Sequence, residues 1–293
     1  MLLLTMARLS RTISVYFRMI KFEHSVFALP FAFVGALMAA SGSPSSKQVF
    51  WIVVAMVGAR SGAMGLNRII DRDIDRENPR TRQREIPSGK IKVGEAVSFT
   101  VFSLAVFIAA AYNLNPLCLK LSPLAVLVLI LYSYTKRFTW MSHFVLGIAI
   151  SLAPVGAWIA VRGTFDTAIL PLSLAVVFWL AGFDVLYALQ DIDFDRTRGL
   201  FSIPGRFGVK RALALARFFH GVSVALLLSS GLLFGRGPFY WTGMALVSAL
   251  FIYEHSLVRS DDLSRLDMAF FNMNGYISVT VFVFTLLDYM LRG

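Results

Sequence analysis

The sequence predicts an all-α membrane protein with nine transmembrane helices. Of its 293 residues, 57% are hydrophobic and only 15% are charged, whereas soluble domains average about 25% charged residues. The mean hydropathy is +0.69. Apolar runs long enough to cross a bilayer follow one another along almost the whole chain. Since no room remains for a soluble domain, residues 1–293 are expected to form a single domain surrounded by membrane lipid.

Nine segments meet the length of about 20 apolar residues that a membrane-spanning helix requires. In chain order they are 25–42, 48–67, 94–113, 116–135, 141–161, 168–190, 211–233, 238–257 and 272–290. Residues 8–23 precede them and predict an amphipathic lead-in, because cations alternate there with apolar residues. No small-residue cleavage site follows Met1 to Met6, so a cleaved signal peptide is not expected.

Two polar loops interrupt the apolar segments, at about 68–93 and 191–210. Both contain helix-breaking residues, namely Pro79, Pro87, Gly89, Gly199, Pro204 and Gly205. The loops at the opposite ends of the segments are short, as in Gly42-Ser43-Pro44. Because loops held by a rigid scaffold carry much of a protein's chemistry, we expect the functional site at the end where the two long loops lie.

The distribution of cations predicts the orientation in the membrane. With the N-terminus in the cytoplasm and the C-terminus outside, most of the 28 Lys and Arg residues fall on the cytoplasmic side, as the positive-inside rule requires. We therefore expect a multi-pass protein of the inner (plasma) membrane with its site toward the cytoplasm. This topology accounts for the net charge of +11, so no nucleic-acid partner is expected.

A short acidic pattern occurs twice, as Asp71-Arg72-Asp73-Ile74-Asp75-Arg76 and as Asp191-Ile192-Asp193-Phe194-Asp195-Arg196. Each copy follows a long apolar segment. Charge at the edge of a membrane span is costly and usually functional. The two carboxylate clusters predict a divalent metal held against an anionic substrate; the alternative is that the aspartates only pair with loop arginines.

The spacing of the polar residues predicts which carboxylates act together. Asn67, Asp71 and Asp75 lie on one stripe of a helix, and Tyr187, Asp191 and Asp195 repeat that spacing. Asp73 and Asp193 point elsewhere. Asp184 lies about 10 Å deeper on the second stripe. Oxygen-only ligands suit Mg²⁺, and two such clusters would clamp a diphosphate between two metals and favour C–O cleavage. The single cysteine, Cys118, excludes a thiolate cluster.

These two segments resemble the Asp-rich motifs, N-x-x-x-D-x-x-x-D and Y-x-x-x-D-x-x-x-D, of the UbiA superfamily of intramembrane aromatic prenyltransferases. The resemblance implies a nine-helix bundle around a central cavity, a polyprenyl diphosphate donor and the use of two Mg²⁺ ions. It implies that the ions are held by Asn67, Asp71, Asp75, Asp191 and Asp195, of which the four aspartates are catalytic. Arg68 departs from the family, in which Asp is common at this position, but it lies off the stripe.

Several further residues are candidates for substrate binding. Arg80, Arg82 or Arg84 is expected to bind phosphate, because Arg grips phosphate with two parallel hydrogen bonds. Residues 84–89 resemble the family's R-P-L-P-S-G loop, with Glu85 in place of Pro. Tyr132, Lys136 and Arg137 resemble its Y-x-x-x-K-R segment and would meet the diphosphate or the acceptor. Arg18 and Lys21 lie where the family places a helix near the acceptor. His143, His220 and His255 look isolated and structural.

The resemblance implies transfer of a polyprenyl chain to an aromatic acid of the 4-hydroxybenzoate type, in ubiquinone or menaquinone biosynthesis. Two alternatives stay open within the family: 1,4-dihydroxy-6-naphthoate as the acceptor for menaquinone, or a chlorophyll, haem or lipid-headgroup acceptor. A secondary transporter is a distant alternative, because intramembrane aspartates occur there too. Transporter sites lie near the midplane of the bilayer, whereas these clusters lie at the ends of the spans.

Overall fold

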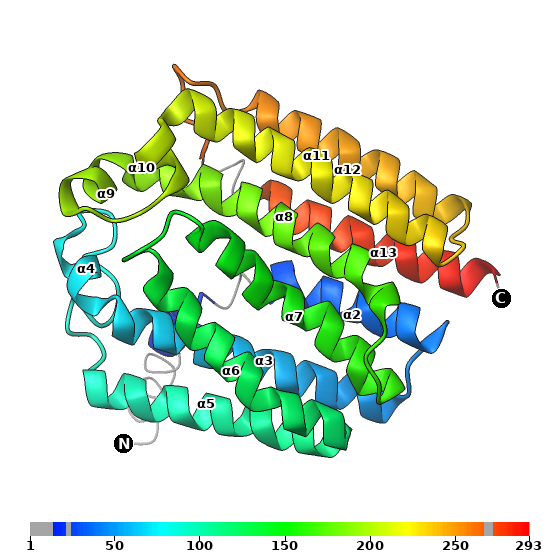
Figure 1. Ribbon diagram of the computed structural model, residues 1–293. Coiled ribbons are helices and arrows are strands. Elements are labelled where there is room, and N and C mark those ends of the chain that lie inside the picture. The colour runs from blue at the N-terminus through cyan, green and yellow to red at the C-terminus, as the bar shows by residue number, and fades with distance from the viewer. Residues whose placement is uncertain (1–13, 22–24, 267–271, 293) are drawn as a thin grey trace, which may run out of the picture.

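A computed structural model describes residues 14–21, 25–266 and 272–292 of the chain. Nine long helices of this described part form one bundle (Figure 1). They are α2 (Ser25–Ala40), α3 (Ser46–Ile70), α5 (Val93–Leu114), α6 (Pro116–Thr135), α7 (Ser142–Arg162), α8 (Leu170–Ala188), α11 (Val209–Leu233), α12 (Pro238–Ser256) and α13 (Asn274–Arg292). Each corresponds to one of the nine predicted segments, so the predicted fold class is confirmed.

Seven of the spans are long and apolar enough to cross a membrane by length and composition alone. Among the other two, α2 is apolar over the shorter range Ala28–Ala40, and α12 ends in the polar residues Glu254 and His255. Both lie in the bundle beside the seven (Figure 1). Of the predicted lead-in, residues 14–19 are helical, and its earlier part lies outside the described residues.

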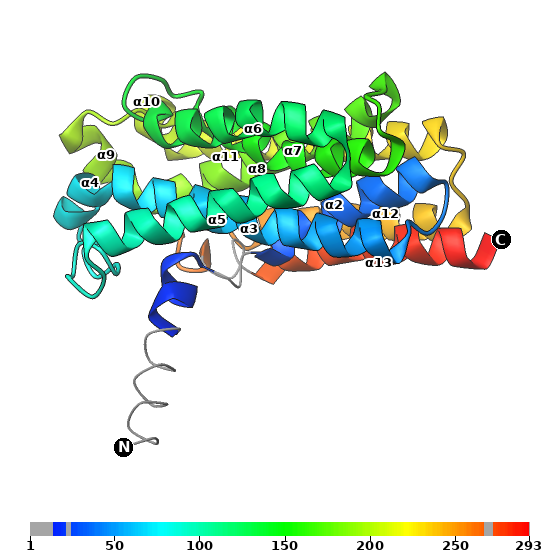
Figure 2. The same ribbon diagram turned by 90° about the horizontal axis from the view of Figure 1, so that it is seen from below.

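Short helices gather at one end of the bundle, far from the C-terminus (Figures 1 and 2). They are α4 (Arg72–Glu77), α9 (Ile192–Arg198) and α10 (Ile203–Phe207). These elements belong to the two long polar loops. The fold therefore brings the loops, which are far apart in the sequence, to the same end of the molecule, as the loop asymmetry predicts.

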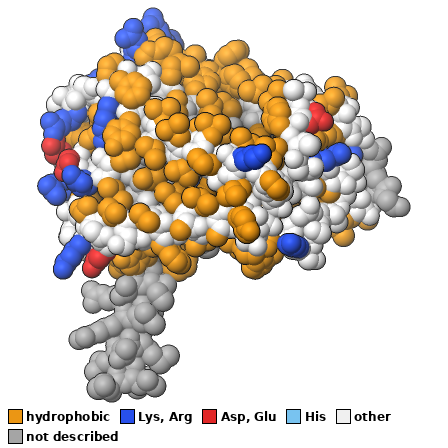
Figure 3. Space-filling model, turned by 60° about the horizontal axis from the view of Figure 1, so that its bottom comes forward, with side chains coloured by type: hydrophobic (Ala, Val, Ile, Leu, Met, Phe, Trp, Pro, Cys, Tyr) orange, Lys and Arg blue, Asp and Glu red, His pale blue; other side chains and the backbone are white. Residues whose placement is uncertain are grey.

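Helix α8 is the most deeply placed span: 72% of its apolar window is buried inside the protein. It packs mainly on α11 and α7, and Trp179 at its centre joins Trp158 and Tyr240 in the main apolar core. The outer helices instead expose large apolar side chains, such as Phe102 and Leu127. Hydrophobic side chains cover most of the face in Figure 3, as a surface in contact with lipid tails requires.

Close helix contacts depend on glycine. A Cβ at Gly147 of α7 would lie 2.4 Å from the carbonyl oxygen of Val177 in α8, and one at Gly35 of α2 would lie 2.4 Å from the carbonyl oxygen of Pro154 in α7. Since backbone atoms cannot yield as a flexible side chain can, only a residue without a side chain lets these helices approach so closely.

Replacing Gly147 by Ala should therefore separate α7 from α8 and destabilise the protein by about 1–3 kcal/mol, the usual cost of overpacking. The matched control is Gly156→Ala in the same helix, where an added Cβ meets no atom within 4 Å. Thermal unfolding in detergent should show a lower melting temperature for the first variant only. Equal melting temperatures would contradict this packing.

Candidate functional site

Both acidic motifs interrupt their helix at the first aspartate, which is the middle residue of each predicted stripe. Asp71 separates α3 from α4 with φ −90° and ψ 1°, and Asp191 precedes α9 with φ −111° and ψ 9°. Despite the break, the N–H of Asp75 donates to the carbonyl of Asp71 at 2.8 Å, and Asn67 Nδ2 donates to Asp71 Oδ2 at 2.9 Å. The predicted stripe thus survives, bent at its centre, and the two motifs share a backbone conformation as well as a sequence.

One cavity of about 270 Å³ receives both motifs. It opens among α3, α4, α6, α7, α8 and α9. Residues from both stripes line it, namely Asn67, Asp71, Asp75, Tyr187, Asp191 and Asp195. The other residues that the sequence singled out and that lie on its wall are Lys21, Arg80, Arg84, Tyr132, Lys136 and Asp184.

The aspartates within each motif differ in burial. Asp71 and Asp75 are only 1% and 3% exposed, and both line the cavity. Asp73 and Asp193 are exposed and are not among the residues that line it. The helical spacing therefore separates inward from outward carboxylates correctly.

Cations from neighbouring elements bind the inward carboxylates. Lys136 Nζ lies 2.6 Å from Asp71 Oδ2, and Arg84 Nη1 donates to both carboxylate oxygens of Asp75 at 2.7 and 2.9 Å. The C-terminal end of α6 and the loop after α4 therefore both contact the first motif. The expected alternative, pairing with arginines, is present, so these cations and a metal would compete for the same oxygens.

Arg80 connects the first loop to the second motif. Its guanidinium donates two hydrogen bonds to the carboxylate of Asp191 and one to the hydroxyl of Tyr187 at 2.5 Å, over whose ring it also lies at 4.7 Å. Asn78 Nδ2 donates to Asp191 as well, at 2.9 Å. Burial alone would lower the pKa of Arg80, but the hydrogen bonds and the charge of Asp191 raise it above its ordinary value, so this cation is permanent.

The donor set fits a hard divalent cation. The five predicted ligands offer only oxygen atoms for binding, which is the preference of Mg²⁺. In addition, Oδ1 of Asp71 is buried and makes no hydrogen bond, although Arg137 Nη2 is 3.0 Å away. A buried carboxylate oxygen without a hydrogen bond is costly, and a metal ion would satisfy it.

Three predicted substrate-binding residues, Arg18, Arg82 and Arg137, lie off the cavity wall. Arg18 and Arg82 are exposed. Arg84, from the same loop as Arg82, is the residue that reaches Asp75 of the first motif. Arg137 donates to the carbonyls of Ser133 and Ile70 at 2.8 and 2.9 Å, so it fastens the end of α6 to the end of α3. None of the three is among the residues that line the cavity, so their predicted contact with substrate gains no support.

Three polar residues deep in the cavity carry more than the sequence indicated. Arg60 and Asp184 both line it; Arg60 lies eleven residues, or about 16 Å, before Asp71, and Asp184 lies seven residues, or about 10 Å, before Asp191. His143 Nδ1 lies 2.7 Å from Asp184 Oδ2, and its Nε2 accepts the N–H of Ile203 at 3.1 Å. Since Nε2 accepts, Nδ1 carries the proton and donates it to Asp184. The expectation that His143 is isolated is therefore wrong. Arg60 could have been identified from the sequence, because a charged residue within a membrane span is usually functional.

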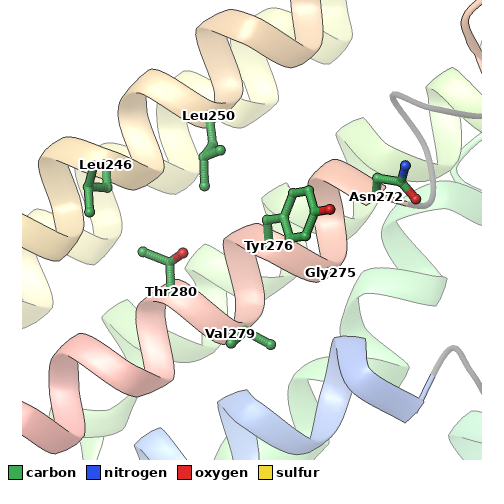
Figure 4. Close-up of a pocket in the computed structure, with 7 residues that line it drawn as sticks. All are labelled: Leu246, Leu250, Asn272, Gly275, Tyr276, Val279 and Thr280. Atoms are coloured by element: carbon green, nitrogen blue, oxygen red, sulfur yellow. The ribbon is translucent and has the colours of Figure 1, made fainter.

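A second hollow lies between α12 and α13, lined by Leu246, Leu250, Asn272, Gly275, Tyr276, Val279 and Thr280 (Figure 4). Its volume is about 680 Å³, and among the described residues its lining contains no ionisable group except the Tyr276 phenol. The described lining therefore offers no carboxylate or cation for a metal or a diphosphate, and the first cavity remains the candidate site.

Known proteins resemble this chain over nearly its full length. It is 30% identical over 287 residues to the 4-hydroxybenzoate octaprenyltransferase of Aromatoleum aromaticum, covering 97% of each protein. It is 31% identical over 259 residues to the protein of that name from Alkalilimnicola ehrlichii, covering 88% of each.

Solved structures share the fold. The apo structure of a UbiA homologue from Aeropyrum pernix K1 matches with a TM-score of 0.83 and 33% identity, over 91% of this chain and 98% of the other. A UbiA homologue from Archaeoglobus fulgidus, solved bound to GPP and Mg²⁺, matches with a TM-score of 0.70 and 21% identity, over 94% and 99%. The model of the UbiA prenyltransferase family matches residues 28–276. The chain belongs to the UbiA prenyltransferase family.

Proposed function

We propose that the protein transfers a polyprenyl chain from a polyprenyl diphosphate to an aromatic acid of the 4-hydroxybenzoate type, in quinone biosynthesis. The observation that carries the proposal is the single cavity in which two acidic motifs and several cations meet. The relatives named 4-hydroxybenzoate octaprenyltransferase support the choice of acceptor. They favour it over 1,4-dihydroxy-6-naphthoate and over lipid acceptors.

In this proposal two Mg²⁺ ions are held at the cavity, one by Asn67, Asp71 and Asp75 and the other by Asp191 and Asp195. When bound, they neutralise the diphosphate as the allylic C–O bond breaks. Their binding would release Lys136, Arg84 and Arg80 from the carboxylates. These cations would then grip the diphosphate oxygens, to which Arg is well suited.

The acceptor would bind deeper, between Arg60 and Asp184. Cleavage of the C–O bond leaves an allylic cation, which the rings of Phe183, Tyr187 and Tyr132 on the cavity wall would stabilise. Its terminal carbon forms the new C–C bond with the aromatic ring, and the ring proton passes to Asp184. His143, donating through Nδ1, would keep the carboxylate of Asp184 oriented for that transfer.

A cation inside the cavity should select acceptors that carry a carboxylate. Lys21 and Arg60 both line the cavity, and we infer that the deeper Arg60 pairs with the acid. Removing one partner of such a pair costs about 2–5 kcal/mol, so Arg60→Gln should raise the KM for the aromatic acid about 30-fold or more. The KM for the prenyl donor should change much less.

Steady-state kinetics in detergent with both substrates varied would measure this. Arg60→Lys retains the charge and should recover part of the affinity, and Lys21→Gln tests the shallower cation. If both Gln variants leave the KM for the acid unchanged, or if the decarboxylated phenol reacts as well as the acid, a neutral acceptor becomes the better reading. That result would leave the prenyl transfer itself intact.

The orientation in the inner membrane also belongs to this proposal, with the cavity open toward the cytoplasm. Single cysteines in a Cys118→Ser background test it. Ser88→Cys and Thr197→Cys, both at exposed positions beside the cavity end, should resist an impermeant thiol reagent on intact cells. Lys47→Cys in the first turn of α3, at the opposite end of the bundle and also exposed, should react. The reverse pattern of labelling would invert the topology.

A further inference from the structure

A second polar cluster lies in the bundle, outside the cavity. It joins His220 of α11 to Glu254 and His255 in the last turn of α12, beside Trp179 of α8 and Asn274 of α13. His220 and Glu254 are 1% and 0% exposed, whereas His255 is only partly buried. None of the three histidine and glutamate side chains lines the catalytic cavity. The expectation that His220 and His255 are isolated residues is therefore wrong.

The three side chains converge on one point. His220 Nδ1 lies 2.9 Å from His255 Nε2 and 3.5 Å from Glu254 Oε2. One ligand atom from each residue lies within 4.8 Å of the other two. Ligands about 2.1 Å from a tetrahedral Zn²⁺ lie about 3.4 Å from one another, and the two separations from His220 Nδ1 lie on either side of that value.

The surrounding hydrogen bonds fix which atoms face inward. His220 Nε2 lies 3.2 Å from the carbonyl oxygen of Trp179, which can only accept, so Nε2 carries the proton and Nδ1 of the neutral ring has a lone pair. Without a metal, that lone pair accepts a hydrogen bond from His255 Nε2; with a metal, both nitrogens would be ligands. Such a bond from the far nitrogen of a histidine is the usual support of a metal ligand. Asn274 Nδ2 donates to Glu254 Oε1 at 3.1 Å, and Trp179 Nε1 donates to Asn274 Oδ1 at 2.6 Å.

These bonds leave Oε2 as the inward oxygen of Glu254. It is buried and makes no hydrogen bond to any residue that the structure describes, and it faces the lone pair of His220 Nδ1 at 3.5 Å. Two electron-rich atoms at that distance in an apolar core repel each other unless a positive charge lies between them. The positive charge of Arg217 interacts with His255 and does not neutralise this oxygen.

We propose that His220, Glu254 and His255 bind a divalent transition-metal ion of the Zn²⁺ type. Two imidazoles and one carboxylate are a common ligand set for zinc, with a water molecule as the fourth ligand. The mixed nitrogen and oxygen donors distinguish this site from the oxygen-only motifs of the cavity, which suit Mg²⁺. The partly exposed His255 gives the ion access. The bound ion would fasten α11 to α12 and, through Trp179 and Asn274, to α8 and α13.

Cobalt substitution tests the site, because Co²⁺ gives visible absorption bands in a four-coordinate site of nitrogen and oxygen ligands. The test uses the full-length protein in detergent, with Asp71→Asn and Asp191→Asn as the background to weaken the catalytic metal site. After chelation and removal of the chelator, the protein should bind one Co²⁺ per chain with these bands. Zn²⁺ should displace the cobalt and raise the melting temperature.

In the same background, Glu254→Gln, His220→Asn and His255→Gln should each abolish the bands and the zinc-dependent rise in melting temperature. His143→Asn is the matched control and should retain both. Because His255 lies at the edge of the cluster, the His255→Gln protein is expected to stay folded. Size-exclusion chromatography would show whether each variant is folded. Absence of stoichiometric cobalt binding, or bands that persist in the folded His255→Gln and Glu254→Gln proteins, would overturn the proposal. An infrared band of a neutral carboxylic acid that disappears in Glu254→Gln would overturn it too, by placing a proton where the metal is proposed.

Discussion

Replacing Asp71 or Asp191 by Asn should lower the rate of prenyl transfer roughly 10²- to 10³-fold, the usual cost of removing one preorganised electrostatic group. Asn retains the shape of the side chain but removes the charge that would hold a metal at the centre of each motif. Asp71 is nearly fully buried, and both residues line the cavity. The rate would be measured with a labelled prenyl diphosphate at saturating Mg²⁺.

The chain supplies its own controls for this experiment. Asp73 and Asp193 lie two residues further on in each motif and are exposed, so Asp73→Asn and Asp193→Asn should stay within about 2-fold of the wild-type rate, since surface substitutions away from a site usually have small effects. All four proteins should have similar melting temperatures to make the comparison valid. Equal losses at all four positions would show that the helical spacing does not select the functional carboxylates.

Chelation of divalent metal should abolish prenyl transfer altogether, and Mg²⁺ should restore it. The physical reason is the charge of the diphosphate, which must be neutralised as the C–O bond breaks. Without metal, Lys136, Arg84 and Arg80 remain bound to the carboxylates and are not available to the substrate. Turnover would be followed during titration of EDTA-treated protein with Mg²⁺.

A second variant separates this effect from the metal proposed at His220, Glu254 and His255. The His255→Gln protein should show the same dependence on Mg²⁺ as the wild type, because its substitution lies outside the cavity. Full turnover of the wild-type protein in metal-free buffer would contradict the metal-dependent mechanism, whatever the outcome at the histidine cluster.

The sequence was sufficient to predict the helices and the inward carboxylates. Apolar runs bounded by helix-breaking residues determine where a span begins and ends, so α6 has its predicted bounds of 116 and 135. The four-residue spacing also separates Asp71 and Asp75 from Asp73 correctly, because that property depends only on local helix geometry.

What the sequence could not reveal depends on contacts between distant segments. Nothing local distinguishes Arg80 and Arg84, which reach the carboxylates, from Arg82, which is exposed. The pairing of His143 with Asp184 depends on how α7 lies against α8, and that of His220 with His255 depends on α11 and α12. Helix packing therefore creates sites that spacing along the chain does not indicate.

A product assay with the purified protein, Mg²⁺, a labelled polyprenyl diphosphate and 4-hydroxybenzoate tests the proposed prenyl transfer itself. We expect a prenylated aromatic acid, with little product from the decarboxylated phenol and none from the Asp71→Asn, Asp191→Asn double variant. The same assay with 1,4-dihydroxy-6-naphthoate and with lipid acceptors measures the preference among acceptors. A labelled product formed only with a lipid acceptor, or hydrolysis of the diphosphate with no transfer to any aromatic acid, would contradict the proposed transfer.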